Sequence, residues 1–330
     1  MASPENQQST NSLSPLAPAL PEKQNESKQW GQLYGSSLGL AVASAIQKHP
    51  GLVLVLTTDM QAATRLAYEL RFFAGDNEEA PILTFPDWET LPYDIFSPHQ
   101  DIISQRLSTL YRLPSVKRGV LIVPIATAMH RLPPRSFLDA STLLLDEGEK
   151  LDMDQMRLRL EEAGYQCVSQ VTEHGDFSVR GSILDLYPMG AKLPYRIDLF
   201  DDEVDSIRTF DPENQRSIER VKRIRLLPAR EFPLHKEGIT HFRQAYREAF
   251  EGNTANSPVY RDVNKGLAPS GIEYYLPLFF EQTQTLFDYL PSNTLLLTDK
   301  KIDDAAETFW QETSRRYDQN RYNPEHPLLP

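Results

Sequence analysis

A glycine-rich stretch followed by an apolar run decides the expected fold of this chain. Residues Gly31–Ala41 read GQLYGSSLGLA, continue into a helical pattern, and are followed by LVLVL at Leu52–Leu56. A working phosphate-binding loop needs a glycine-rich turn, a lysine for the phosphates and a Ser or Thr for magnesium. Aligned on Gly35, the lysine position holds Leu38 and the Ser/Thr position holds Gly39. The loop is therefore present in outline without the side chains that hold a nucleotide.

A second stretch has the layout of the acidic motif that completes such a site. Residues Leu295–Ile302 read LLLTDKKI. In a working site an acidic pair ends an apolar strand and holds magnesium, but here Asp299 is followed by Lys300. The predicted degenerate nucleotide site consists of Gly35, Ser37, Leu38, Gly39, Asp299 and Lys300. We expect an ATPase scaffold that has lost its chemistry and that binds other proteins.

Composition narrows the class of protein. The 330 residues suffice for two or three domains, at roughly 100–200 residues each. The net charge of −12 opposes general binding of nucleic acid. Cys167 is the only cysteine, which excludes an intrachain disulfide and a Cys-rich zinc site. No apolar run approaches the roughly 18 residues of a membrane helix, and the N-terminus does not resemble a secretion signal. We expect a cytoplasmic protein.

The chain divides by its hydrophobic pattern. Residues 1–28 are rich in Ser, Asn, Gln and Pro, and we expect them to form a disordered extension. From Trp30 to about Ile125, helical patterns alternate with apolar runs, which predicts a parallel sheet covered on both faces. After Pro133-Pro134, a helix at Met153–Ala163 and several short strands predict a compact α+β domain with an antiparallel sheet.

The remainder of the chain returns to longer elements. We expect a strand from Ser217, helices at Ile239–Phe250 and Ala305–Tyr317, and a buried strand at Thr294–Leu297 between these helices. The last residues, Tyr322–Pro330, are Pro-rich and are interpreted as a linker.

Several polar stretches have a plain structural explanation. Asp87–Asp94, which reads DWETLPYD, is more simply a loop that packs its aromatic side chains than a substrate-binding loop. The acidic run Asp201–Asp205 is typical of a solvated hairpin turn, with a cation site as the alternative. The basic stretch Arg216–Arg225 alternates in a way that favours one strand with solvated charges over a phosphate track. The scattered histidines predict no metal site.

The segment His174–Pro188, which reads HGDFSVRGSILDLYP, is more informative. A period of two directs Phe177 to one face of a strand and Arg180 to the other. An exposed arginine is a common interface anchor. The alternative is a surface arginine paired with a carboxylate such as Asp185 or Asp198, and the pattern alone leaves both open.

The same segment resembles domain 2 of the excision-repair protein UvrB. The resemblance is carried by Phe177–Pro188, with the pattern F-x-V-R-G-x-I-x-D-x-Y-P, and by Arg196–Val204, which reads RIDLFDDEV. GIEY at Gly271–Tyr274 and LFDYLP at Leu286–Pro291 also resemble UvrB, and they lead to the position of its acidic helicase motif.

Two further stretches narrow the resemblance to one family. Asp87–Asp94 and Ser97–Leu107, which reads SPHQDIISQRL, are similar to the amino-terminal region of bacterial transcription-repair coupling factors. The resemblance extends over nearly all of residues 30–330. Because these factors are far longer than this chain, we interpret it as their UvrB-homology region, without the polymerase-interacting and translocase domains.

The resemblance implies a fold of three parts. Domain 1a (residues 29–126) and domain 1b (residues 213–330) would pack together as a degenerate P-loop, RecA-like α/β unit with a parallel sheet. Domain 2 (residues 127–212), a small α+β domain, would be inserted between them.

The resemblance also implies a function. The chain would be a non-catalytic adaptor that recruits UvrA to DNA damage where RNA polymerase has stalled, as in transcription-coupled nucleotide-excision repair. The implied UvrA-binding residues are Arg180, Phe177, Ser178, Asp185 and Arg196. This region would need no cofactor. In the full-length protein, ATP and magnesium would serve a C-terminal DNA translocase, and other domains would bind RNA polymerase and double-stranded DNA.

Two departures from UvrB qualify this expectation. UvrB carries an Arg-x-Arg pair on its recognition strand, whereas this chain has Ser178 at the first position and keeps Arg180 at the second. The long hairpin with which UvrB clamps DNA would follow the 85–95 region, where little sequence is available. We therefore expect DNA clamping to be lost.

Two other functions stay open beside the adaptor. One is a UvrB-like ATP-dependent DNA-binding or helicase module, against which Leu38 and Lys300 argue. The other is a mainly autoinhibitory domain that covers its own surface in the full-length protein, which is compatible with the adaptor.

Overall fold

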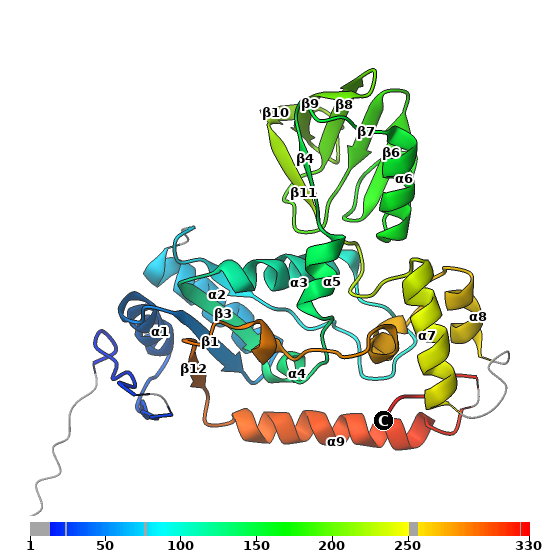
Figure 1. The fold of residues 1–330 in the computed structure, drawn as a ribbon. Coiled ribbons are helices and arrows are strands. Elements are labelled where there is room, and N and C mark those ends of the chain that lie inside the picture. The colour runs from blue at the N-terminus through cyan, green and yellow to red at the C-terminus, as the bar shows by residue number, and fades with distance from the viewer. Residues whose placement is uncertain (1–13, 24, 76–77, 251–256, 324) are drawn as a thin grey trace, which may run out of the picture.

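The computed structural model describes residues 14–23, 25–75, 78–250, 257–323 and 325–330. The chain forms a lower α/β unit and a smaller upper unit joined at a narrow waist (Figure 1). Half of the extension predicted for residues 1–28 lies outside the described residues. Its described part has no helix or strand, and it is tied down at one point, where the indole Nε1 of Trp30 donates to the Ala19 carbonyl at 2.8 Å.

A four-stranded parallel sheet organises the lower unit. Its order is β12-β1-β3-β2, and every described pairing is parallel. The strands are β1 (Leu52–Thr57), β2 (Ile82–Thr84), β3 (Gly119–Pro124) and β12 (Leu295–Thr298). Every residue of β1 and β3 is buried, as continuous apolar runs require. The predicted parallel sheet is confirmed.

Helices cover both faces of this sheet. On one face, α1 (Ser37–Lys48) and α2 (Met60–Ala74) share an apolar cluster with β1 and β3. On the other face, the alternate residues of the same strands pack with α3 (Gln100–Arg112), in a cluster that continues into the upper unit. The start of α2 is set by Asp59, whose carboxylate accepts from the Ala62 amide.

One strand of the sheet is less buried than predicted. The sequence predicts a buried strand at Thr294–Leu297, but β12 lies at the edge of the sheet and alternates between half-buried and exposed residues. Leu296 is 48% exposed. One face of β12 packs on the apolar cluster through Leu295 and Leu297. Its other face is not covered by any of the described residues.

The upper unit contains the six-stranded sheet β10-β9-β8-β7-β6-β5, which is antiparallel apart from the short β5–β6 pair. Its strands are β5 (Gln166–Cys167), β6 (Asp176–Arg180), β7 (Ile183–Leu186), β8 (Tyr195–Phe200), β9 (Glu203–Phe210) and β10 (Ser217–Val221). The helix α6 (Met153–Glu162) buries Met156 and Leu160 in the same apolar cluster as the inner face of this sheet. The predicted antiparallel α+β unit is confirmed.

The basic stretch forms two strands rather than the one predicted. The first strand, β10, pairs with β9 and ends before Lys222. The second strand, β11 (Arg223–Leu226), pairs with β4 (Leu143–Asp146) in a separate two-stranded ribbon. Both strands lie beyond residue 212, where the sequence analysis ended the inserted unit. The first strand of the six-stranded sheet, β5, is only two residues long.

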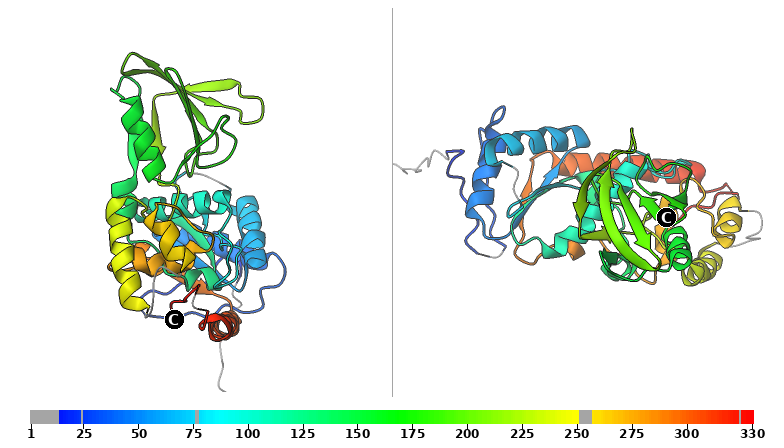
Figure 2. Two further views of the ribbon diagram at one scale, coloured as in Figure 1. Left: turned by 90° about the vertical axis from the view of Figure 1, so that its right-hand side faces the viewer. Right: turned by 90° about the horizontal axis from the view of Figure 1, so that it is seen from above.

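The remaining elements belong to the lower unit (Figures 1 and 2). They are α4 (Ile125–Ala128), α5 (Arg135–Ser141), α7 (Lys236–Ala249), α8 (Pro258–Asn264), α9 (Ile302–Asn320) and the 3-10 helices η1 (Leu113–Ser115), η3 (Ile272–Phe279) and η4 (Leu286–Tyr289). The helix α9 lies on the side opposite the upper unit. In the loop at Asp87–Asp94, Trp88 is buried and Tyr93 packs on Tyr274 and Tyr317, as predicted for a packing loop.

Polar contacts fix the upper unit on α3. The amide of Gly190 donates to Ser104 Oγ at 2.8 Å, and His174 Nδ1 lies 2.6 Å from Asp101 Oδ1. The view from above shows the upper unit displaced away from α1 (Figure 2). The six-stranded sheet of the upper unit and the start of α1 are therefore far apart on the molecule.

Candidate functional site

The candidate interaction surface is one face of the six-stranded sheet in the upper unit. Ser178 in β6 stands opposite Asp185 in β7, which stands opposite Arg196 in β8. Arg196 in turn stands opposite Arg208 in β9, and Arg208 opposite Arg220 in β10. Directly opposed residues share a face of a sheet. A row of polar and charged residues therefore crosses all the strands from β6 to β10.

A second row runs beside the first on the same face. Arg180 stands opposite Ile183, Ile183 opposite Asp198, and Asp198 opposite Ser206. These residues are two positions away from members of the first row, and a strand returns to the same face every second residue. The sheet thus gathers several arginines on one side and its apolar side chains on the other.

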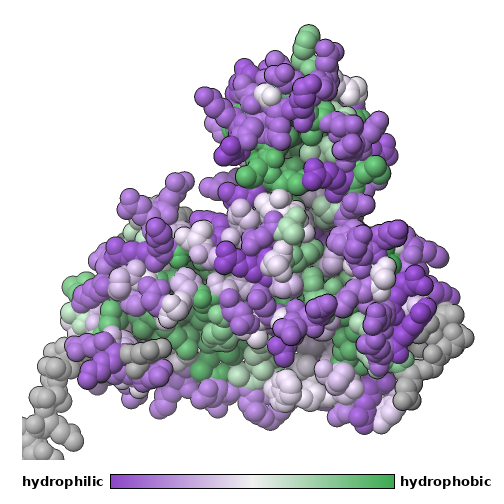
Figure 3. Space-filling model, in the orientation of Figure 1, coloured by the Kyte–Doolittle hydropathy of each residue, from purple (hydrophilic) through white to green (hydrophobic). Residues whose placement is uncertain are grey.

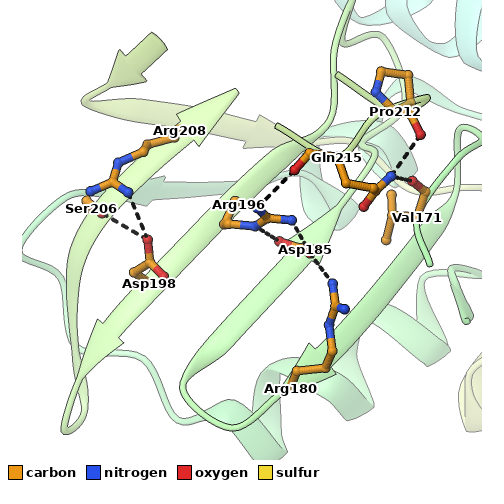
Figure 4. A network of polar contacts seen from close by, with 9 residues as sticks. All are labelled: Val171, Arg180, Asp185, Arg196, Asp198, Ser206, Arg208, Pro212 and Gln215. Carbon is orange, nitrogen blue, oxygen red and sulfur yellow. Dashed lines mark hydrogen bonds and ion pairs between the residues drawn. The ribbon is translucent and has the colours of Figure 1, made fainter. Parts of the chain in front are cut away.

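Asp185 is the centre of the contacts on this face (Figure 4). Its side chain is 1% exposed. Its Oδ2 accepts from Arg180 Nη2 at 2.8 Å and from Arg196 Nη2 at 2.9 Å, and its Oδ1 accepts from Arg196 Nε at 2.8 Å. The hydrogen bond with Asp185 raises the pKa of Arg196. A buried carboxylate that accepts from two guanidinium groups holds both of them in fixed positions.

The two arginines differ in how far they reach the solvent. Arg196 is 19% exposed, lies 4.9 Å from the ring centroid of Phe210 and donates to the Gln215 carbonyl at 3.2 Å. Arg180 is 57% exposed and is anchored through Asp185. Arg180 is therefore available to a partner, whereas Arg196 supports the carboxylate that positions it. The ion pair with Asp185, one of the two alternatives left open by the sequence, is present.

Besides Asp185, two more residues predicted to bind a partner are not on the surface. Phe177 is completely buried in the core of the upper unit, and Ser178 is 4% exposed. Phe177 lies on the apolar face, as its position in the strand predicts. Ser178 lies on the polar face, but that end of the face is covered. Gln215, in the turn at 211–216, donates to the Val171 carbonyl at 3.0 Å and so closes the turn over the sheet.

Other members of this face were not predicted from the sequence. Arg208 lies 3.7 Å from Asp198 as an ion pair, and Ser206 Oγ donates to the same carboxylate at 3.3 Å. Arg220 pairs with Glu147 at 3.0 Å. Their alternation along β8 and β9 is visible in the sequence, but the strand register that places them beside Arg180 is not.

The start of α1 does not have the arrangement of a phosphate-binding loop. Such a loop joins the end of a strand to the start of a helix. In the described residues before α1 there is no strand, and β1 follows the helix. Gly35 has a φ of +56°, which favours glycine. Leu38 packs against the apolar cluster between α1 and the sheet. The position of the phosphate-binding lysine is thus taken by a half-buried apolar side chain.

A carboxylate occupies the place where a nucleotide phosphate would approach α1. Ser36 Oγ donates to Glu69 Oε1 at 3.2 Å, and a Cβ on Gly39 would lie 2.6 Å from Glu69 Oε2. Ser37 Oγ donates to the Tyr34 carbonyl at 2.7 Å. An acidic side chain at a helix N-terminus competes with phosphate for the same amides and the same positive end of the dipole.

The acidic motif expected after β12 has one acidic residue, Asp299, where a working site has two adjacent ones. Asp299 and Lys300 are both exposed, and the Asp299 carboxylate accepts from the amide of Lys301 at 2.8 Å. Asp299 therefore closes the turn into α9. Within the described ranges, no group of three or more His, Cys, Asp or Glu residues could hold a metal ion.

The other charged stretches are neutralised locally. Asp201 begins a turn with a φ of +54°, and Asp202 pairs with Lys150 at 2.9 Å, as predicted for a solvated turn. In the basic stretch, Arg223 pairs with Asp146 at 2.6 Å. Polar residues cover most of the visible surface of both units (Figure 3). In the part of the chain that the structure describes, no helix is long and apolar enough to span a membrane.

A family model of known proteins matches the part of the chain that contains the polar face. Residues 143–232 match the family model of the UvrB interaction domain, and this range contains both rows of the polar face. The transcription-repair-coupling factor of Escherichia coli K12 is 47% identical over 312 residues, which cover 94% of this chain and 27% of the relative.

Transcription-repair-coupling factors of other bacteria match a similar share of this chain. The transcription-repair-coupling factor of Haemophilus influenzae is 45% identical over 314 residues, with 94% of this chain and 27% of the relative covered. That of Bacillus subtilis is 28% identical over 282 residues, with 81% of this chain and 24% of the relative covered. The chain thus spans about a quarter of the length of the curated relatives it matches.

Proposed function

This chain belongs to the transcription-repair-coupling factor family, of whose members it covers about a quarter, and we propose that it is a non-catalytic adaptor that binds UvrA through the polar face of its upper unit. The observation that carries the proposal is the exposed Arg180, held by the buried Asp185 within the range that matches the UvrB interaction domain. UvrA bound here would be brought to DNA where RNA polymerase has stalled.

The geometry supports a binding role for this face. An arginine whose position is already set by a buried carboxylate loses little side-chain freedom when a partner binds. It presents planar donors to carboxylates or backbone carbonyls. Three buried or half-buried residues would support Arg180 and the sheet without touching the partner: Arg196, Asp185 and Phe177. Ser178, which is covered, would not touch the partner.

The lower unit is proposed as a degenerate RecA-like scaffold formed by domains 1a and 1b. Support comes from the parallel sheet, to which residues near both ends of the chain contribute strands β1 and β12, and from Glu69 at the start of α1. We infer that domain 2 comprises the strands from β4 to β11, which lie within or next to the range of the family match. ATP hydrolysis, polymerase contacts and duplex DNA contacts are assigned to other parts of the full-length protein.

The test is a calorimetric titration of purified UvrA with this chain. We expect saturable binding, which Arg180→Ala weakens about thirtyfold, since an interface arginine is worth about 2 kcal/mol. The matched control is Arg157→Ala on α6, which removes another exposed, ion-paired arginine. Wild-type affinity of Arg180→Ala would show that the polar face is not the UvrA surface.

A further inference from the structure

A cavity of about 520 Å³ lies where the upper and lower units meet. Its wall includes Gly164 just after α6, Arg230 in the segment that returns to the lower unit, and Glu273 in η3. The loop between α8 and η3 supplies Leu267 and Ser270. Pockets of this size accept small molecules, and they occur preferentially between domains. The position is independent of the polar face proposed to bind UvrA.

Arg230 brings an unpaired positive charge to this cavity. Among the described residues, none accepts a hydrogen bond from its guanidinium or forms an ion pair with it. Burial lowers the pKa of Arg230, and the charge of Glu273 opposes that effect. The side-chain stem is confined as well, because a Cβ on Gly164 would lie 2.9 Å from Arg230 Cγ. A largely buried guanidinium without a partner is unfavourable unless an anion joins it.

The carboxylates nearest to Arg230 are engaged elsewhere. Glu231 accepts from Arg106 Nε at 2.6 Å and from Arg106 Nη2 at 3.3 Å. Glu273 Oε2 accepts from Ser97 Oγ at 2.8 Å, and burial raises the pKa of Glu273 to about 7, with the charge of Glu231 adding to the rise. The half-buried Asp262 on α8 is the other carboxylate on the wall.

One buried acceptor near the cavity does not face it. Among the described residues, the side-chain oxygen Oε1 of Gln100 has no hydrogen-bond partner, and it has no surface that a water molecule can reach. Gln100 stands at the start of α3 and lines the same cavity as Arg230. That oxygen offers no contact to a ligand in the cavity, so Arg230 sets the chemistry of the ligand, which must carry an anionic group.

We propose that this cavity binds a small oxyanion, whose carboxylate or phosphate group pairs with Arg230. Guanidinium groups bind both kinds of oxyanion through two parallel hydrogen bonds. Because residues of both units line the cavity, the bound anion holds the upper unit on the lower one. Binding therefore stabilises one arrangement of the two units.

The test is calorimetry of the whole chain at pH 6.5 and constant ionic strength, with inorganic phosphate, glycerol 3-phosphate and citrate as probes. We expect one saturable site for at least one probe, which Arg230→Gln weakens at least about tenfold, as loss of a charged hydrogen bond predicts. Arg261→Gln on α8 is the matched control: it removes the same charge from an exposed residue outside the cavity, and it retains wild-type binding.

A second variant decides the matter if Arg230→Gln does not fold. Ser270 is exposed at the rim of the cavity, so Ser270→Glu leaves the core intact, places a like charge beside the anion and weakens binding. Binding of the two phosphates alone assigns a phosphate ligand, and binding of citrate alone assigns a carboxylate. The proposal is overturned if no probe binds the wild-type chain, or if Ser270→Glu and a folded Arg230→Gln bind as the wild type does.

Discussion

Arg106 donates from its Nε to Glu231 Oε1 at 2.6 Å, and both side chains are completely buried. Arg106 belongs to α3 in the lower unit, and Glu231 to the segment that follows the upper unit. The guanidinium also donates to the Pro86 carbonyl at 2.9 Å and lies 4.3 Å from the ring centroid of Phe85. The pair thus joins the returning chain to the core of the lower unit.

We expect Glu231→Gln to be strongly destabilising. It leaves the charge of Arg106 buried without a counter-ion, which costs about 3–5 kcal/mol. The free energy of unfolding from urea titrations measures the effect. The control is Glu219→Gln, which changes an exposed glutamate on β10 and should alter stability by less than about 0.5 kcal/mol. Equal stability of the two variants would contradict a structural role for the pair.

Phe177→Ala and Arg180→Ala should separate stability from binding. Phe177 is completely buried, so its truncation costs about 3–5 kcal/mol of unfolding free energy. Arg180 is mostly exposed and leaves Asp185 paired with Arg196, so its truncation costs at most about 1 kcal/mol. Melting curves of both variants beside the UvrA titrations test this. An early melt of Arg180→Ala would instead assign Arg180 to the structural ion pair alone.

Glu273 should make the stability depend on pH. Burial raises the pKa of its carboxyl group from the usual 4.5 to about 7 in the folded chain, so the folded state binds more protons than the unfolded state between these values. Stability therefore falls as pH rises from about 4.5 to about 7, by about 3 kcal/mol from this residue. Arg230, Glu231 and the hydroxyl of Ser97 are the polar groups that act on it.

Glu273→Gln should flatten this part of the pH profile and raise stability at pH 8. The amide can still accept the hydrogen bond from Ser97, and no buried charge has to form. Unfolding free energies between pH 5 and pH 8 provide the measurement. Glu281→Gln changes an exposed glutamate and should leave the profile as it is. An unchanged slope in Glu273→Gln would exclude Glu273 as its source.

The chain should not bind magnesium-ATP. Leu38 is half-buried against the apolar cluster, and Glu69 places a carboxylate at the start of α1. Restoring the motif residues by Leu38→Lys with Gly39→Thr should therefore fail to create a site, because a side chain at position 39 would meet Glu69 at 2.6 Å. Calorimetry with both proteins tests this. Micromolar binding by the wild-type chain would refute the prediction.

The secondary structure was largely accessible from the sequence because it depends on local periodicity. The continuous apolar runs of β1 and β3 predicted a buried parallel sheet, and the structure has one. The predictions were wrong where pairing partners decide the outcome. Thr294–Leu297 contains an apolar run like that of β1, yet β12 lies at an edge. The basic stretch forms two strands, interrupted at Lys222, because its two halves pair with different strands.

The sequence by itself determined which side of their strand residues such as Phe177 and Arg180 would occupy, because alternation along a strand is a local property. Only the tertiary structure decided that Asp185 is buried beneath Arg180 and Arg196, and that Ser178 is covered. It likewise decided that Arg106 pairs with Glu231 while Arg230 stays unpaired in a cavity. Register and burial arise from contacts between distant segments, and the free energy of a charged side chain depends on those contacts more than on its neighbours in the chain.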